Sequence, residues 1–65
     1  IIGYVVYAAG NSGAKASCFI PAGYAGTYQC ASDDWYCTFE FDGGGTATKT
    51  GGNGSITNTV PVYNS

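Results

Sequence analysis

Short apolar segments alternate with glycine-rich turns along the whole chain, and this alternation constrains the fold more than any other feature. Leu and Met are absent while Gly supplies 11 of 65 residues, so good helix formers are scarce. Turns recur at intervals of about 8 to 12 residues, which is typical of a small β-sandwich or barrel. We therefore expect one all-β domain over residues 1–65, antiparallel, with five to six short strands. The segments that predict them are 1–9, 15–20, 24–30, 35–41, 46–50 and 55–63.

The clearest of these segments is WYCTFEF, residues 35–41. Large apolar residues alternate there with polar ones, and the period of two predicts one inward and one outward face. The inward set is Trp35, Cys37, Phe39 and Phe41.

A fold of this size usually needs a disulfide, a metal or a partner chain, because it buries only about 60% of the surface that its unfolded form exposes. Cys18, Cys30 and Cys37 predict one disulfide and one spare thiol, and the sequence leaves all three pairings open. Zinc is not expected, because three cysteines without a histidine make a poor structural site.

The charge of the chain excludes several function classes. Only Lys15 and Lys49 are basic and the net charge is −2, so binding to nucleic acid is not expected. No apolar run approaches the roughly 20 residues of a membrane-spanning helix.

Catalytic side chains are also scarce. There is no His or Arg, so neither a histidine-activated nucleophile nor an arginine clamp can form. The four acids are expected to be solvated strand and turn residues. The chain is therefore expected to be a non-enzymatic protein without a cofactor or metal.

Aromatic and acidic residues supply the binding candidates. Tyr24 and Tyr36 are expected either in the core or in an exposed contact patch, since tyrosine is enriched at binding surfaces. Trp35 has the same two interpretations, with the core favoured. Asp33 and Asp34 lie at the tip of a predicted hairpin, residues 31–36, which a Cys30–Cys37 clasp would present.

Both faces of the segment Ile1–Ala9 are apolar. Such a strand is either covered on both sides or meets a partner chain or a second copy. Asn53-Gly54-Ser55 is an N-glycosylation sequon. Together with the cysteines it favours a secreted, extracellular protein. The first residue is not Met, which indicates that a signal or pro-segment was removed or that the chain was trimmed.

The stretch Cys18-Phe19-Ile20-Pro21-Ala22-Gly23 resembles the Cys-x-Pro-Ala-Gly stretch of host-selective toxins of plant-pathogenic fungi, a group of secreted β-sandwich effectors. The chain has one extra residue before the proline and no Cys near either end, so no disulfide or binding residue is carried over. Its size, low charge and lack of helix formers also resemble subunits of processed fungal killer toxins.

Three functions follow as hypotheses. The first is a fungal-type toxin or effector that engages a protein or carbohydrate on another cell. The second is a subunit of a larger extracellular assembly, either a two-chain processed toxin or a filament, with Ile1–Ala9 at the interface. The third is a hydrolase inhibitor that presents the 31–36 hairpin.

Overall fold

A computed structural model describes residues 1–64 of the chain and has six β-strands and no helix in that range. The strands are β1 (Gly3–Ala9), β2 (Lys15–Pro21), β3 (Gly26–Ala31), β4 (Tyr36–Phe41), β5 (Ala47–Gly52) and β6 (Ser55–Val62). The all-β prediction is confirmed, and strand boundaries differ from the predicted ones by one or two residues in most cases.

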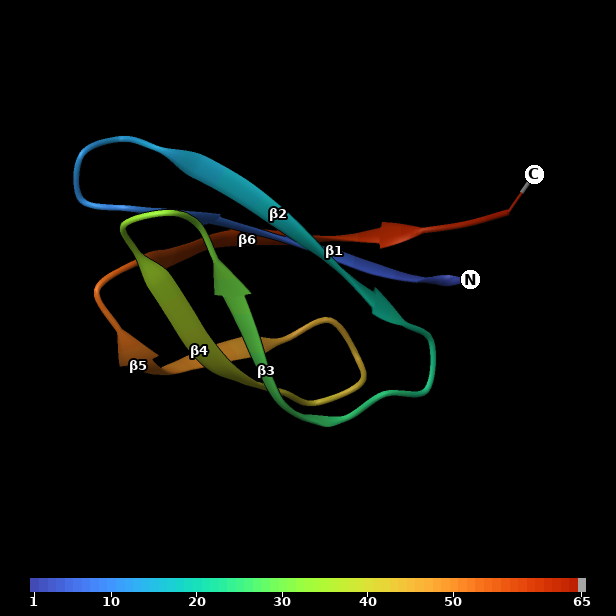
Figure 1. Cartoon of the computed structure of the whole chain (residues 1–65). Coiled ribbons are helices and arrows are strands. Elements are labelled where there is room, and N and C mark those ends of the chain that lie inside the picture. Colours follow the sequence, from blue (N-terminus) through green and yellow to red (C-terminus); the bar gives the residue numbers. More distant parts are fainter. Residues whose placement is uncertain (65) are drawn as a thin grey trace.

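The strands form two separate antiparallel sheets, so the fold is a sandwich (Figure 1). Sheet A has the order β2-β1-β6 and sheet B the order β3-β4-β5. The chain crosses between the sheets twice, from β2 to β3 and from β5 to β6. The two chain termini leave sheet A at the same end of the molecule.

The core lies between the two sheets and contains side chains from both of them. Sheet A contributes Val6, Ala8 and Ile20. Sheet B contributes Cys30, Cys37, Phe39 and Phe41, and Trp35 adds its ring from the residue just before β4. The predicted inward set of residues 35–41 is therefore confirmed, because its period of two matches the pleat of β4.

One disulfide, Cys18–Cys30, joins β2 of sheet A to β3 of sheet B, and Cys37 is a free, buried thiol. The disulfide-stapled sandwich is thus confirmed, and one of the three open pairings is selected. The Cys30–Cys37 clasp that the inhibitor hypothesis requires is not formed, because the neighbouring sheet brings Cys18 against Cys30.

The segment 24–30 was predicted as one strand, but Tyr24 and Ala25 precede β3. The reason is the turn before them, which the Tyr24 backbone N–H closes by donating to the Pro21 carbonyl at 3.2 Å. Gly26 then begins β3 with a φ of +140°, a value that glycine adopts without steric strain.

Candidate functional site

A hollow of about 400 Å³ lies at one end of sheet B, where the β3–β4 turn meets the β5–β6 turn. We call it the tip pocket, and its wall consists of Gln29, residues 31–36 and Asn53. All of the predicted hairpin tip thus lines this pocket.

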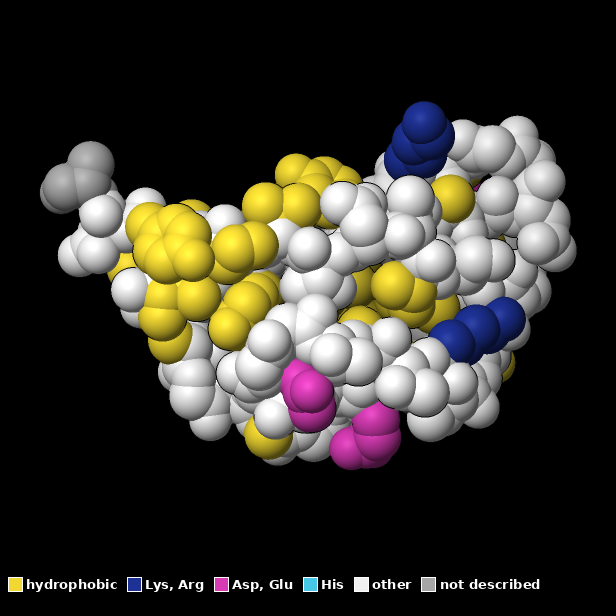
Figure 2. Space-filling view, turned by 180° about the vertical axis from the view of Figure 1, so that it is seen from behind, with side chains coloured by type: hydrophobic (Ala, Val, Ile, Leu, Met, Phe, Trp, Pro, Cys, Tyr) yellow, Lys and Arg dark blue, Asp and Glu magenta, His cyan; other side chains and the backbone are white. Residues whose placement is uncertain are grey.

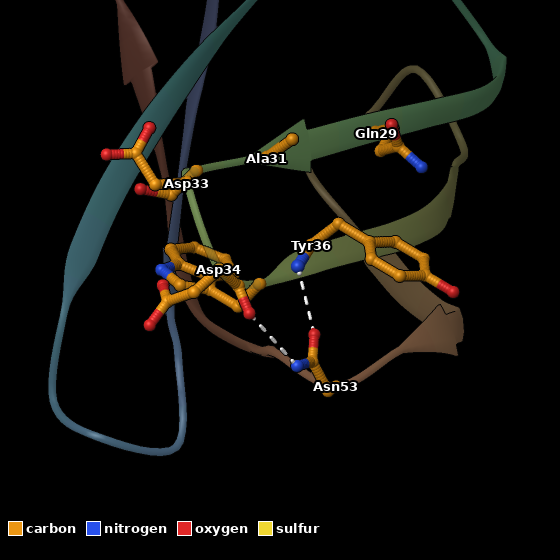
Figure 3. A pocket seen from close by; sticks show the side chains of 8 residues that line it. Gln29, Ala31, Asp33, Asp34, Tyr36 and Asn53 are labelled. Atoms are coloured by element: carbon orange, nitrogen blue, oxygen red, sulfur yellow. Dashed lines mark hydrogen bonds between the residues drawn. The ribbon is translucent and has the colours of Figure 1, made fainter.

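The side chain of Asn53 ties the two turns together. Its Oδ1 accepts a hydrogen bond of 3.0 Å from the Tyr36 backbone N–H, and its Nδ2 donates to the Asp34 carbonyl at 3.4 Å (Figure 3). The next residue, Gly54, donates its N–H to the Tyr36 carbonyl at 2.9 Å. These bonds satisfy backbone groups that the turns would otherwise leave without partners.

From the sequence, Asn53 is a candidate only for glycosylation. The structure leaves it exposed and places it in the wall of the tip pocket. A glycan would be attached to Nδ2, the atom that donates to Asp34. Glycosylation of Asn53 and occupation of the tip pocket by a ligand would therefore compete for the same space.

Trp35 belongs to the core. Only 4% of its surface is exposed, and the indole ring is held between two turns. A Cβ atom on Gly10 would lie 2.6 Å from Cδ1 of the ring, and one on Gly54 would lie 2.5 Å from Cε3. The indole Nε1 is buried without a hydrogen-bond partner among the described residues. Trp35 therefore supports the pocket from behind and offers little surface of its own for contact.

Tyr36 is the accessible aromatic residue of the site, with 47% of its surface exposed. Its ring extends to the same side of the β3–β4 hairpin as the amide of Gln29 (Figure 3). Gln29 Nε2 donates in turn to the hydroxyl of Thr38 at 3.2 Å. The outer face of sheet B therefore offers one aromatic ring beside amide and hydroxyl groups.

Asp33 and Asp34 are exposed at the turn. Their carboxyl groups extend from the turn away from the ring of Tyr36 (Figure 3). The rim of the pocket is thus negative on one side and aromatic on the other. No group of three or more His, Cys, Asp or Glu side chains within residues 1–64 is placed to hold a metal ion.

Tyr24 lies apart from this pocket and is partly buried. Its hydroxyl donates to the Thr27 carbonyl, and its ring packs edge-on against Tyr28 with the centroids 5.6 Å apart. The structure therefore separates the two tyrosine candidates, and Tyr36 alone belongs to the tip pocket.

The other two acids support the structure of sheet B. Glu40 accepts a hydrogen bond from the hydroxyl of Thr27 on the neighbouring strand. Asp42 Oδ1 accepts backbone N–H bonds from Gly44 at 2.7 Å and Thr46 at 3.0 Å. These bonds, that of Thr46 first, hold the pKa of Asp42 below its usual value because they stabilise the charged carboxylate.

The outer face of sheet A has a different character. Val5 lies between Phe19 of β2 and Val60 of β6 in one row across all three strands. Phe19 is 46% exposed and Val60 39% exposed, and Tyr7 follows on the same face. On the side of the molecule drawn in Figure 2, the largest gathering of hydrophobic side chains lies toward the end that carries the chain termini, and the lysines lie toward the opposite end. The predicted two-faced strand is thus the central strand of sheet A, with one face in the core.

Comparison with family models, with curated proteins and with solved structures finds no match to this chain. Within the described residues, no helix has the length and apolar character needed to cross a membrane.

Sequence reasoning missed two parts of the site. Asn53 was placed in a turn, but its bonds to the other hairpin depend on how the sheets bring the two turns together. Gln29 was one polar residue among many in a weak strand. The alternation within β4 could have indicated that Tyr36 faces outward, and it is the signal from which the site can be found.

Proposed function

We propose that the chain is a secreted, non-catalytic binding domain of the toxin or effector type, which engages a target-cell molecule at the tip pocket. The observation that carries the proposal is the half-exposed ring of Tyr36 beside the amides of Gln29 and Asn53, over a hollow of about 400 Å³. An aromatic ring beside hydrogen-bonding groups suits a carbohydrate or a peptide turn, because the ring supplies contact area at a low entropic cost.

The support for a secreted protein is the disulfide, which persists in oxidising compartments. The support for binding in place of catalysis is the composition, which lacks His and Arg. The resemblance of residues 18–23 to fungal host-selective toxins supplies the class of target, a molecule on another cell.

The experiment compares Tyr36→Ser with Tyr63→Ser, a matched control at an exposed tyrosine outside the pocket. Fluorescently labelled wild type and both variants are applied to plant protoplasts, to yeast cells and to an oligosaccharide array. We expect Tyr36→Ser to lose at least tenfold in binding, while Tyr63→Ser binds like the wild type. Equal binding by Tyr36→Ser and wild type would reject the tip pocket as the contact site.

A second candidate function is a subunit of a larger extracellular assembly. The observation in its favour is the exposed apolar row of Phe19, Val5 and Val60 on sheet A, a kind of surface that marks contact sites when it is continuous. The partner proposed for this surface is a second copy of the same chain. Sedimentation over a wide concentration range should then give a mass that doubles, and Phe19→Ser should abolish the doubling. A monomer at every concentration would reject this function.

An inhibitor that presents residues 31–36 has less support, because the clasp that would hold that loop is not the disulfide of this protein. Asn53 and the turn bonds hold the loop in its place.

A further inference from the structure

Cys37 lies directly opposite Cys30 in the ladder between β3 and β4. Both side chains are fully buried on the inner face of sheet B. Residues that face each other across antiparallel strands have Cα atoms roughly 4.5–5.5 Å apart, which falls within the separation of about 4.4–6.8 Å that a disulfide spans. The register therefore places Cys30 and Cys37 at a Cα separation that a disulfide can span.

Cys30 is instead bonded to Cys18, whose Cα lies 5.9 Å away in β2. It consequently has one cysteine neighbour in each sheet and can bond to only one of them at a time. The spare thiol adjoins the disulfide, and the two alternative bonds differ in what they connect. The bond to Cys18 joins the sheets, whereas a bond to Cys37 would lie within sheet B.

We propose that Cys37 is the attacking thiol of an internal thiol–disulfide exchange that moves the bridge from Cys18–Cys30 to Cys30–Cys37. The thiolate of Cys37 attacks Sγ of Cys30, and the new S–S bond forms as the bond to Cys18 breaks. Cys18 leaves as a thiolate and takes up the proton that Cys37 lost. One disulfide and one thiol are present before and after the step, so neither oxidant nor reductant is consumed.

The exchange removes the covalent tie between the edge strands β2 and β3. The only covalent links between the sheets are then the β2–β3 and β5–β6 connections of the chain. The free thiol also moves from the fully buried position of Cys37 to the partly buried position of Cys18. The protein can thus lose the disulfide between its sheets without an external oxidant or reductant. The exchange leaves a free thiol at Cys18, nearer the surface than Cys37.

The closed fold restrains this reaction. Burial raises the pKa of the Cys37 thiol, while the Lys49 ammonium acts in the opposite direction. Because the thiolate is the attacking species, exchange is slow in the closed sandwich and proceeds in the fraction of molecules whose core has opened locally.

The experiment maps the disulfide of the native wild-type chain during alkylation. The protein is held at about pH 8 with iodoacetamide, sampled over hours to days, and then cleaved with a protease that cuts before Asp. Cuts before Asp33, Asp34 and Asp42 place Cys37 alone on the fragment 34–41, while Cys18 and Cys30 remain together on 1–32. We expect an alkylated product in which Cys18 carries the label and 34–41 is disulfide-linked to 1–32.

Two results would overturn the proposal. One is a product labelled on Cys37 with 34–41 released as a free fragment, which means that the core opens without exchange. The other is a wild-type chain that takes up no label at all. Cys37→Ser is the control and should lose Cys18 labelling completely, with Cys37→Ala in its place if a buried hydroxyl prevents folding.

A second variant tests the geometry without depending on the exchange rate. In Cys18→Ser the only available pair is Cys30 and Cys37. In a buffer of oxidised and reduced glutathione, we expect this variant to form that disulfide as a folded monomer. A folded Cys18→Ser chain that keeps two free thiols would show that the two sulfur atoms cannot meet, and the exchange would be rejected.

Discussion

The six-membered ring of Trp35 faces Gly54 so closely that a Cβ atom there would lie 2.5 Å from Cε3. Real side chains do not approach so closely, and the nearest atoms belong to a ring that is itself buried in the core. The β5–β6 turn can therefore reach the β3–β4 turn only because residue 54 has no side chain.

Gly54→Ala is expected to lower the free energy of unfolding by about 1–3 kcal/mol, the usual effect of overpacking a core. Urea titration followed by Trp35 fluorescence measures it. Gly51→Ala is the matched control, because a Cβ atom there meets only Cβ of Thr38, at 3.9 Å. Its stability should stay within about 0.5 kcal/mol of the wild type. Equal stabilities for the two variants would contradict the close approach of Gly54 to Trp35.

Asn53→Ala should separate the two turns of the tip pocket. It removes the acceptor of the Tyr36 N–H and the donor to the Asp34 carbonyl, and each such hydrogen bond contributes about 0.5–1.5 kcal/mol. We expect a net loss of about 1–2 kcal/mol and faster hydrogen exchange at the Tyr36 amide. Asn58→Ala, an exposed asparagine on β6, serves as the control. Unchanged exchange at Tyr36 would show that Asn53 does not hold the turns.

Asp42 gives the stability of the chain a dependence on acid pH. Its folded-state pKa is lowered by the N–H groups of Thr46 and Gly44, so the charged form is stabilised by folding. That contribution is present above the ordinary aspartate pKa of about 3.9 and is lost as the pH falls through the lowered value. The melting temperature of Asp42→Asn should therefore lie below that of the wild type near pH 7, and the gap should close toward about pH 2.

The control for this measurement is Asp33→Asn. The Asp33 carboxylate accepts none of the side-chain hydrogen bonds found within residues 1–64. The melting temperature of Asp33→Asn should therefore differ little from that of the wild type at every pH. If the melting temperatures of Asp42→Asn and the wild type differ by the same amount from neutral to acid pH, the charge of the Asp42 carboxylate does not stabilise the loop.

Reduction of the Cys18–Cys30 bond should destabilise the sandwich by about 2–4 kcal/mol, because the bridge closes a loop and restricts the unfolded chain. Its 12-residue separation places it near the middle of that range. Urea titrations with and without a phosphine reductant measure the loss. Cys37→Ala should show the same difference on reduction, since its own thiol is not bonded. A reduced wild type as stable as the oxidised one would mean that the bridge is not a staple.

The strands could be predicted from the sequence because each depends on local information. The alternation from Trp35 to Phe41 follows from the pleat alone. The turn predicted at residues 51–54 is shorter in the structure, because Gly51 and Gly52 still pair with β4 and only Asn53 and Gly54 lie between β5 and β6. The disulfide could not be predicted in the same way. Cys30 and Cys37 are close in sequence and directly opposite in the hairpin, yet the partner of Cys30 comes from the other sheet. The packing of the two sheets determines which cysteine bonds to Cys30. The spacing of the cysteines in the sequence does not predict this pairing.

The candidate site was predicted in part for the same reason. The sequence predicts a hairpin tip at residues 31–36, and it leaves Tyr36 with two interpretations, in the core or in an exposed contact patch. The contribution of Asn53 depends on two hairpins meeting, which is a property of the whole sandwich. Phe19 was counted as part of a short strand, and its exposure follows only from the position of β2 at the edge of sheet A.

The antiparallel pairing of β1 with β6 also determines how the molecule responds to tension. Gly3 faces Val62 at the end of the ladder where both termini leave the sheet. A force that pulls the termini apart therefore acts on one pair of residues at a time and peels β6 from β1 like a zipper. It never loads the whole ladder in shear, in which all the hydrogen bonds would have to break together. A chain tethered through both of its ends would open sheet A at low force, while the bridge between Cys18 and Cys30, outside the path of the load, kept β2 tied to β3 of sheet B.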